Sequence, residues 1–316
     1  MMSLLRVAAA AVLLAAASAG SAEFPDRPVR MIVGFGAGGG SDLIARLIAK
    51  DLPALWGQPV PVENRPGADG MIAASAIAGG PADGYNLAVI TNGHTISPSQ
   101  RSVPYDPVES FAPVILVAST PNFLVVHPSL PVYNVKQLIA LAKARPGALS
   151  FGSSGGGTSA YFASEMFRQM AGLDMVHVPY KGSAQAAIGL LSGEVQLMFG
   201  ALSTIHAHIK SGRLRVLAIS SPQRWAQEPN VPTVAENGLK GFQAASWYGI
   251  LSHAKTPPEI VRKINADIVK VVHAPALNQS LKSQGFDVIA NTPEEFREVI
   301  KSDLVRWAAV VKNARN

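Results

Sequence analysis

Short apolar runs alternate with amphipathic segments along most of the chain. The runs VRMIVGF, at residues 29–35, and YNLAVITN, at residues 85–92, are short and rich in aliphatic residues, which is typical of buried β-strands. After the first run, apolar residues recur with helical spacing from residue 44 to residue 55, which predicts an amphipathic helix. The same reasoning predicts strands at residues 59–64, 111–119, 122–128, 148–154, 175–180, 195–201, 214–221 and 245–254, and helices from about residue 134, at 160–171 and at 184–191.

Two late segments carry a helix start signal. The stretches TPPE, beginning at Thr256, and TPEE, beginning at Thr292, each offer threonine as the cap, proline in the first turn and glutamate three residues after the cap. Alternating strands and helices predict an α/β fold with mostly parallel sheets flanked by helices. Because 316 residues exceed the usual span of one compact core and no low-complexity linker divides them, we expect two lobes joined by crossing strands.

Glycine-rich turns follow two of the predicted strands and precede predicted helices. The first is GFGAGGGSD, beginning at Gly34, and the second is GSSGGGT, beginning at Gly152. The free N–H groups and the dipole of a helix N-terminus attract anions, and glycine lets a ligand approach the backbone closely. We therefore expect one anion-binding helix end in each lobe and a small carboxylate held between them. The alternative is that both turns are ordinary connections in which glycine serves only packing.

The first 22 residues have the pattern of a secretory signal peptide. Arg6 precedes a short run rich in alanine and leucine, which ends in small residues, so we expect cleavage after Ala22. A short membrane anchor is the alternative, but the apolar run is brief for a membrane span. We therefore expect the mature protein to begin near Glu23 and to lie outside the cytoplasm.

Composition removes several classes of function. The chain carries a net charge of +6, but its basic residues are scattered, and no basic block or aromatic-basic stripe indicates a nucleic-acid partner. It has no cysteine, which excludes disulfides and thiolate metal sites. His206 and His208 are separated by one residue, so on a helix they point to different faces, and we expect no metal site there.

A dinucleotide-binding site is one enzymatic alternative. Residues 34–39, GFGAGG, fit the G-x-G-x-x-G fingerprint, and Glu63 stands near the end of the next predicted strand, where a ribose-binding acid belongs. Against this interpretation, the signal peptide directs the chain to a compartment where nicotinamide cofactors are scarce.

A serine hydrolase is the second enzymatic alternative. Residues 152–156, GSSGG, read as G-x-S-x-G after a strand, which is the setting of a nucleophilic serine. Such an enzyme needs a later histidine that is oriented by an acid. His273 lies within a helical pattern, and His253 ends a predicted strand with no evident acid beside it, so the required histidine is hard to place.

Longer segments resemble one protein family over essentially the whole mature chain. The segment GAGGGSDLIARLIAKDLPALWGQPVPVENRPGADG, from Gly36 to Gly70, looks like the periplasmic solute-binding receptors of tripartite tricarboxylate transporters, often called the Bug family. Five further segments are similar to the same family in order and spacing: PADGYNLAVITNG, YDPVESFAPVILVASTPNFLVVHPSLP, SSGGGTSAYFASEMF, HVPYKGSAQA and PNVPTVAENGLKGF. Glu63 is then part of the family's Glu-Asn-Arg-Pro-Gly turn, and no ribose is required.

The resemblance implies a two-lobed periplasmic binding protein of type II, which closes on its ligand like a flytrap. Lobe 1 would comprise residues 23–121 and 243–316, and lobe 2 would comprise residues 122–242. The resemblance also implies a monomeric, non-enzymatic receptor with no cofactor and no metal, which delivers a small organic acid to a membrane permease of two further subunits. The acid stays open: a dicarboxylate or tricarboxylate, an aromatic acid, an amino acid or a neutral compound such as nicotinamide.

The resemblance implies a set of ligand contacts as well. Two of them have alternative roles: Asp42 offsets the helix dipole, orders the loop or meets a ligand amine, and Lys181 contacts the ligand or is a solvated turn residue. The chain departs from the family at Gly34 and Gly36, where prolines are common, and at Gly200, where many relatives carry a polar or acidic side chain. The implied contacts are Phe35, Gly36, Ala37, Gly38, Gly39, Ser41 and Asp42 in the first loop, Asn92 and Thr95 after the third strand, Ser154, Gly155, Gly156 and Thr158 in the second glycine turn, Tyr180, Lys181, Gly182 and Ser183 before a short helix, and Gly200.

Overall fold

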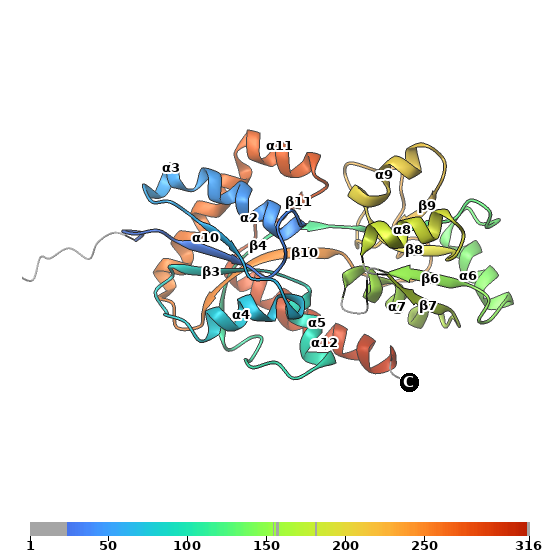
Figure 1. The fold of residues 1–316 in the computed structure, drawn as a ribbon, viewed down its shortest axis with the longest axis horizontal. Coiled ribbons are helices and arrows are strands. Elements are labelled where there is room, and N and C mark those ends of the chain that lie inside the picture. Colours follow the sequence, from blue (N-terminus) through green and yellow to red (C-terminus); the bar gives the residue numbers. More distant parts are fainter. Residues whose placement is uncertain (1–23, 154, 156–157, 181, 315–316) are drawn as a thin grey trace, which may run out of the picture.

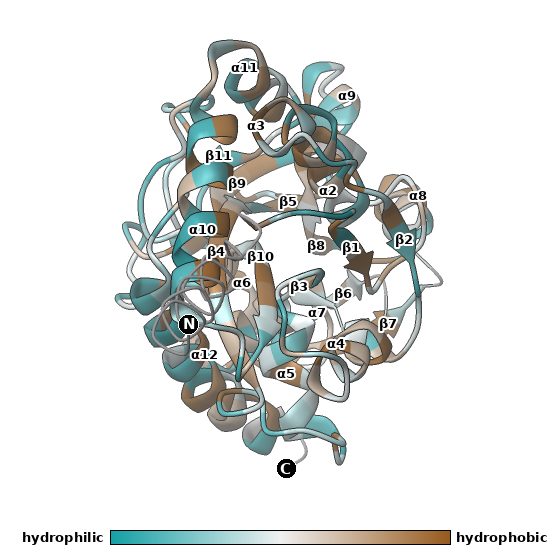
Figure 2. Ribbon diagram, turned by 90° about the vertical axis from the view of Figure 1, so that its left-hand side faces the viewer, coloured by the Kyte–Doolittle hydropathy of each residue, from teal (hydrophilic) through white to brown (hydrophobic). Residues whose placement is uncertain are grey.

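The computed structural model has two lobes, each built on one β-sheet flanked by helices (Figure 1). It describes residues 24–153, 155, 158–180 and 182–314, so the predicted signal peptide lies outside the described residues. Apolar colouring is concentrated on interior elements such as β10 and the end of β1 (Figure 2). Within the described part of the chain, no helix combines the length and apolar character that a membrane span requires.

Lobe 1 contains a six-stranded sheet in the order β11-β4-β10-β3-β1-β2. Its strands are β1 (Arg30–Val33), β2 (Val62–Asn64), β3 (Asn86–Thr91), β4 (Phe111–Thr120), β10 (Ser246–His253) and β11 (Asp287–Val288). Its helices are α2 (Gly40–Asp51), α3 (Pro53–Trp56), the 3-10 helix η1 (Ala68–Gly70), α4 (Met71–Ala78), α5 (Gly93–Gln100), α10 (Pro258–His273), α11 (Pro275–Ser283) and the start of α12 (Pro293–Ala314).

Both faces of the lobe 1 sheet are covered by apolar helix faces. On one face, α2 and α10 bury residues such as Ile44, Ile48 and Ile264 against the strands. On the other face, α4 and the first half of α12 bury residues such as Ile77 and Phe296. The two layers hold the strands so that the carboxyl ends of β1 and β3 point toward lobe 2.

Lobe 2 contains a five-stranded sheet in the order β7-β6-β8-β5-β9. Its strands are β5 (Asn122–Val126), β6 (Ser150–Ser153), β7 (Val176–Pro179), β8 (Leu197–Ala201) and β9 (Arg215–Ile219). Its helices are α6 (Val135–Ala144), α7 (Ser159–Ala171), α8 (Ser183–Leu191) and α9 (Leu202–Lys210).

Most strands of each sheet run in one direction, as predicted, namely β1, β2, β3 and β4 in lobe 1 and β6, β7, β8 and β9 in lobe 2, but both sheets are mixed. β1 pairs in parallel with β2 and β3, and β6 pairs in parallel with β7 and β8, but β10 and β5 are antiparallel to both of their neighbours. The cause is the crossing between lobes. The strands that lead into the turns run toward the other lobe, whereas β5 and β10 begin at the crossing and run away from it.

The lobes are joined by crossing strands, as predicted. β4 ends at Thr120 in the first sheet, and β5 begins at Asn122 in the second. The chain returns beside this crossing, where Asn122 Nδ2 donates to the carbonyl oxygen of Ala244 at 3.1 Å before β10 begins at Ser246. Two neighbouring extended segments therefore connect the sheets.

Helix α12 is a third connection, which the sequence did not predict. Its first half packs on lobe 1, but Trp307 and Val310 belong to the hydrophobic core of lobe 2. The rings of Trp307 and Phe162 of α7 lie edge to face, with centroids 5.7 Å apart. Gln169 Nε2 donates to the carbonyl oxygen of Val310 at 2.9 Å. The helix thus ties the two lobes together (Figure 1).

The two predicted helix start signals have different outcomes. At Thr292 the signal is confirmed: Thr292 N–H donates to Glu295 Oε2 at 2.9 Å, and Glu295 N–H donates to Thr292 Oγ1 at 3.2 Å. At Thr256 it is wrong, because Pro257 is the residue that precedes α10 and Thr256 Oγ1 lies 2.6 Å from Ser252 Oγ. The second proline disfavours a helical backbone at Pro257, so the helix begins later than the threonine requires.

Candidate functional site

A cleft of about 390 Å³ lies between the two lobes, at the carboxyl ends of β1, β3 and β6. Its walls come from both lobes and from β10, which connects them. The lining residues are Phe35, Gly39, Gly40, Ser41, Asp69, Thr91, Asn92 and Gly93 from lobe 1, Thr158, Ser159 and Ser183 from lobe 2, and Ser246 and Tyr248 from β10.

Four helices point their N-termini at this cleft. Helices α2 and α5 begin at Gly40 and Gly93 in lobe 1, and α7 and α8 begin at Ser159 and Ser183 in lobe 2. All four residues line the cleft. The first-turn N–H groups of a helix lack intrahelical partners, and the helix dipole is positive at that end. The described residues that precede α2, α5 and α8 make no side-chain cap, although Gly93 N–H of α5 donates to Thr91 Oγ1 at 3.3 Å. Together, the four helix ends form an electropositive site whose backbone N–H groups can hold anions.

The glycine turn of lobe 1 is held by the buried carboxylate of Asp42. Its Oδ2 accepts a hydrogen bond from Gly38 N–H at 2.9 Å, and its Oδ1 accepts one from Asn64 Nδ2 at 2.8 Å. Arg46 Nε, one turn along α2, lies 3.0 Å from both oxygens. The hydrogen bond from Arg46, with those from Gly38 and Asn64, lowers the pKa of Asp42 to about 2. Of the roles considered for Asp42, the structure supports ordering of the loop.

The glycine turn of lobe 2 is held by the hydroxyls of two flanking residues. Ser153 Oγ is buried, accepts a hydrogen bond from Gly155 N–H at 3.2 Å and lies 2.7 Å from His177 Nε2. Thr158 Oγ1 donates to the carbonyl oxygen of Gly155 at 2.9 Å and accepts from Tyr161 N–H at 3.3 Å as the cap of α7. Side chains that flank the turn therefore hold the start of α7 in position.

The crossing strand β10 contributes to both halves of the cleft. Asn92 Oδ1 accepts a hydrogen bond from Trp247 N–H at 2.8 Å, which fastens the start of α5 to β10. Ser246 Oγ lies 2.6 Å from Ser159 Oγ, at the start of α7. Burial raises the pKa of Tyr248 to about 12, so its hydroxyl, which lies over Gly40, stays a hydrogen-bond donor. The crossing between the lobes is thus part of the site.

The structure brings six of the implied contacts to the cleft. They are Phe35, Gly39, Ser41, Asn92, Thr158 and Ser183. Seven lining residues are not among the individual contacts named from the sequence, although Gly40 and Gly93 lie within the implied loops 35–42 and 92–95. The seven are Gly40, Asp69, Thr91, Gly93, Ser159, Ser246 and Tyr248. Gly40, Gly93 and Ser159 could have been found from the helix-end argument itself, since each is the first residue of its helix. Ser246 and Tyr248 stand in a strand with no motif, and only the crossing brings them to the site.

The other described candidates support the cleft without lining it. Thr95 is buried and its Oγ1 donates to the carbonyl oxygen of Asn92 at 3.0 Å. Tyr180 packs its ring against Gly152 and Gly189. Gly200 lies in β8 between Met198 and Ile205, so its missing side chain does not enlarge the cleft. Gly36, Ala37, Gly38, Asp42, Gly155 and Gly182 also stand outside the lining, whereas Ser154, Gly156 and Lys181 lie outside the described residues.

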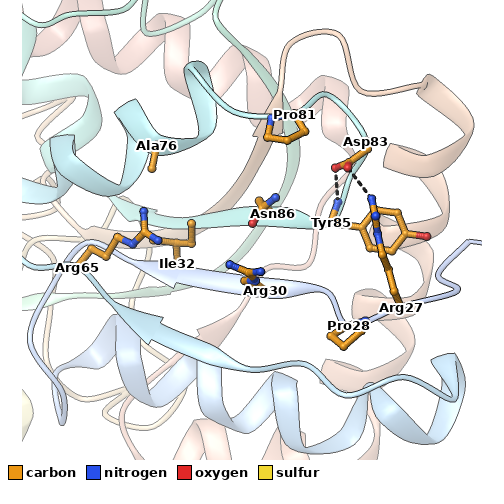
Figure 3. A pocket seen from close by; sticks show the side chains of 10 residues that line it. All are labelled: Arg27, Pro28, Arg30, Ile32, Arg65, Ala76, Pro81, Asp83, Tyr85 and Asn86. Carbon is orange, nitrogen blue, oxygen red and sulfur yellow. Dashed lines mark hydrogen bonds and ion pairs between the residues drawn. The ribbon is translucent and has the colours of Figure 1, made fainter.

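A second hollow, of about 540 Å³, lies on lobe 1 at the amino ends of β1 and β3 (Figure 3). Three arginines, Arg27, Arg30 and Arg65, stand along it. Arg27 pairs with Asp83 at 2.8 Å and Arg65 pairs with Glu63 at 2.8 Å, so two of the three are engaged. This hollow belongs to one lobe and faces no helix N-terminus named above, so the cleft between the lobes is the better candidate for a ligand site.

Comparison with known proteins settles the family. Residues 44–315 match the sequence model of a family described as tripartite tricarboxylate transporter family receptor. The chain belongs to this family. BugT of Bordetella pertussis (strain Tohama I) is 36% identical to this receptor over 300 residues, which are 94% of this chain and 92% of BugT.

Solved structures of similar proteins have the same two-lobed fold. R. palustris Rpa4515 with adipate is 35% identical, with a TM-score of 0.78 over 92% of this chain and 98% of that one. MatC (Rpa3494) from Rhodopseudomonas palustris with bound malate is 28% identical, with a TM-score of 0.75 over 91% of this chain and 100% of MatC. The periplasmic binding protein BugD is 31% identical, with a TM-score of 0.75 over 92% of this chain and 98% of BugD.

Membership of a receptor family removes the two enzymatic alternatives, and local geometry agrees. A side chain at Gly34 would collide with the backbone of Gly70, so this glycine serves close packing rather than a pyrophosphate. Glu63 is bound by Arg65, whose hydrogen bond lowers the pKa of that carboxyl. The candidate hydrolase residues His253 and His273 end β10 and α10 outside the cleft lining. This receptor is a binding protein.

Proposed function

We propose that this receptor captures a small organic acid with two carboxylates between its lobes. The observation that carries the proposal is the convergence of four helix N-termini, two from each lobe, on one cleft. Each pair of positive helix ends suits one carboxylate, so a ligand with a carboxylate at each end would bridge the lobes. The relatives solved with adipate and malate hold ligands of this class.

The middle of the cleft suits the carbon chain of such a ligand. Phe35 and Tyr248 line it with aromatic rings, and Tyr248 also offers a hydroxyl donor. Apolar surface between two polar ends is the arrangement that fixes the orientation of a small ligand. The described lining contains no basic side chain, so recognition would rest on backbone N–H groups, hydroxyls and dipoles.

Binding would be coupled to closure of the lobes about the crossing. We assign residues 23–121 and 243–316 to one moving lobe and 122–242 to the other, with the end of α12 resting on the second. A ligand held by both lobes stabilises the closed state by its differential affinity. A membrane permease of the tripartite type would then recognise that state and accept the acid. Residues 1–22 would direct the receptor to the periplasm and would be removed by cleavage after Ala22.

The experiment is a comparison of dicarboxylates with their neutral diamides. Thermal shift and calorimetry on monomeric mature protein, starting at Glu23, should show one site that binds succinate, adipate or malate. The diamide of the same length keeps the shape and loses the charge, so it should bind at least about tenfold more weakly. Aromatic acids, amino acids and nicotinamide complete the panel. Equal affinity for a dicarboxylate and its diamide would contradict the proposal, as would a dicarboxylate that is chemically converted.

A further inference from the structure

Asp69 places a carboxylate in a cleft otherwise suited to anions. Among the described lining residues, Asp69 has the one carboxylate side chain. It lies in η1, the single turn that joins β2 to α4. An acid at the meeting point of positive helix ends weakens the field that attracts carboxylates. The position of this carboxylate therefore indicates a specific role in binding.

The backbone at Asp69 is held in an unfavourable conformation. Its φ and ψ are 57° and 31°, in the left-handed region, and the preceding residue Ala68 also has a positive φ of 48°. Glycine adopts this region freely, whereas aspartate does so only at a cost. The turn is wedged against two glycines: a side chain at Gly34 would meet Gly70, and one at Gly93 would meet the carbonyl oxygen of Asp69. Strain retained at a binding site points to a functional role.

The carboxylate of Asp69 is only partly engaged. Its Oδ2 accepts a hydrogen bond from Arg101 Nη2 at 3.0 Å, and no described residue donates to its Oδ1. The side chain of Asp69 is 30% exposed, and that of Arg101 is 44% exposed. Arg101 follows the last residue of α5 and stands outside the cleft lining. One carboxylate oxygen is thus open to accept a hydrogen bond from a ligand.

We propose that Asp69 selects acids that carry a hydrogen-bond donor, an ammonium or a hydroxyl group, beside a carboxylate. This inference rests on the proposed binding of dicarboxylates. A donor on the ligand satisfies the open oxygen of Asp69, and an ammonium also neutralises its charge. A plain dicarboxylate brings a like charge close to Asp69 and offers no donor to its open oxygen. Asp69 therefore discriminates against ligands that lack the donor, while Arg101 limits the repulsion.

Three acids test the inference because they share one carbon skeleton. Succinate, malate and L-aspartate differ only in bearing hydrogen, hydroxyl or ammonium at one carbon. We expect calorimetry on the wild-type protein to show malate and L-aspartate binding at least about tenfold tighter than succinate, the usual effect of a hydrogen bond to a charged group. Equal affinities for all three would overturn the inference.

Two substitutions of Asp69 separate charge from hydrogen bonding. Asp69→Asn keeps a hydrogen-bond acceptor and loses the charge. The affinity for L-aspartate should therefore fall about tenfold or more, the affinity for malate should change little, and the affinity for succinate should rise. Asp69→Gly removes both the acceptor and the charge, so the affinities for the three acids should converge. Glycine adopts the left-handed backbone freely, so the fold is preserved. Asp83→Asn is the matched control, because it removes an acid from lobe 1 outside the cleft and should leave the order of affinities unchanged.

Arg101→Gln tests the same electrostatics in the opposite direction. Without its cationic partner, Asp69 should bind L-aspartate more tightly and succinate more weakly. Retained discrimination in Asp69→Gly would overturn the inference and leave the proposed function intact, provided succinate or adipate still binds. Failure of both the wild-type protein and Asp69→Gly to bind any of these dicarboxylates would overturn the proposed function itself.

Discussion

Gly38 and Gly39 are neighbours in the first glycine turn, but they have different backbones. Gly38 has a φ of 83°, which an L-residue with a branched side chain rarely adopts. Gly39 precedes α2 with a φ of −77° and a ψ of 168°, which is ordinary extended backbone. Gly39 lines the cleft and Gly38 does not. The first glycine is therefore required by the turn, whereas the second keeps a wall of the cleft free of a side chain.

This difference predicts two separate effects of valine. Gly38→Val should lower the free energy of unfolding by about 1–2 kcal/mol, because valine is strained at positive φ. Gly39→Val should change it by less than about 0.5 kcal/mol. It should nevertheless reduce ligand affinity sharply, since its side chain enters the cleft. Urea denaturation and calorimetry measure the two effects. Wild-type affinity in Gly39→Val would mean that this glycine is there for packing alone.

At the residue scale, the sequence identified candidate site residues better than it identified the residues that they contact. Asp42 was singled out at the start of its helix, but its partner Asn64 comes from the next strand, and no spacing rule connects the two. Asp69 was not singled out, because an aspartate between an alanine and a glycine is common in turns. Its place in the cleft depends on how η1 packs against β1 and α5, which only the fold determines.

At the element scale, the start of α2 depends on the pair formed by Asp42 and Arg46. The two side chains are one helical turn apart, and their shortest contact is 3.0 Å. The carboxylate is buried, while half of the Arg46 side chain is exposed, so solvent screens part of the attraction. The pair and the hydrogen bond to Gly38 hold α2 and the glycine turn in one geometry.

The depressed pKa of Asp42 predicts a pH-dependent contribution to stability. Because the pKa is about 2 in the folded protein and 3.8 as the reference, the contribution is complete above pH 4 and is lost as the pH falls toward 2. Asp42→Asn should therefore lower the free energy of unfolding by about 1–2 kcal/mol at pH 7 and by much less near pH 2. Chemical denaturation of both proteins across this range measures the difference. A constant difference at all pH values would contradict the assigned role.

The elements that the sequence missed lack a regular pattern. α5 has eight residues, from Gly93 to Gln100, with Pro98 inside it, so no apolar period identifies it. It nevertheless supplies one of the four helix ends, so the site could be predicted only in part. The glycine turns in the sequence indicated one helix end per lobe, whereas the fold brings two helix ends from each lobe to the cleft. The long amphipathic helices and the buried strands were predictable because burial imposes their periods.

At the scale of the whole molecule, α12 ties the two lobes together. Trp247 Nε1 of β10 donates to Asp303 Oδ2 of α12 at 2.7 Å, which ties the crossing to this helix. A few residues later, Trp307 is buried in the core of lobe 2. Across the other side of the crossing, Trp225 Nε1 of lobe 2 donates to Asp287 Oδ1 of lobe 1 at 2.7 Å. The proposed closure would therefore have to bend around these contacts or break them.

Removing the Trp307 ring tests the structural part played by α12. Trp307→Ala should lower the free energy of unfolding by about 3–5 kcal/mol, the usual cost of deleting a large buried aromatic side chain. Val305→Ala, at a position that is 75% exposed on the same helix, is the control and should cost less than about 0.5 kcal/mol. Urea denaturation compares them. Similar small effects of both substitutions would mean that the end of α12 is not anchored in lobe 2.

The central claim is that the cleft binds a dicarboxylate by its helix N-termini, and a crystal structure of the mature receptor with adipate or malate tests it most directly. The account predicts one carboxylate within hydrogen-bond distance of backbone N–H groups at the starts of α2 and α5, and the other at the starts of α7 and α8. A ligand seated in the arginine-lined hollow of lobe 1, or in the cleft with its carboxylates directed away from all four helix ends, would contradict it.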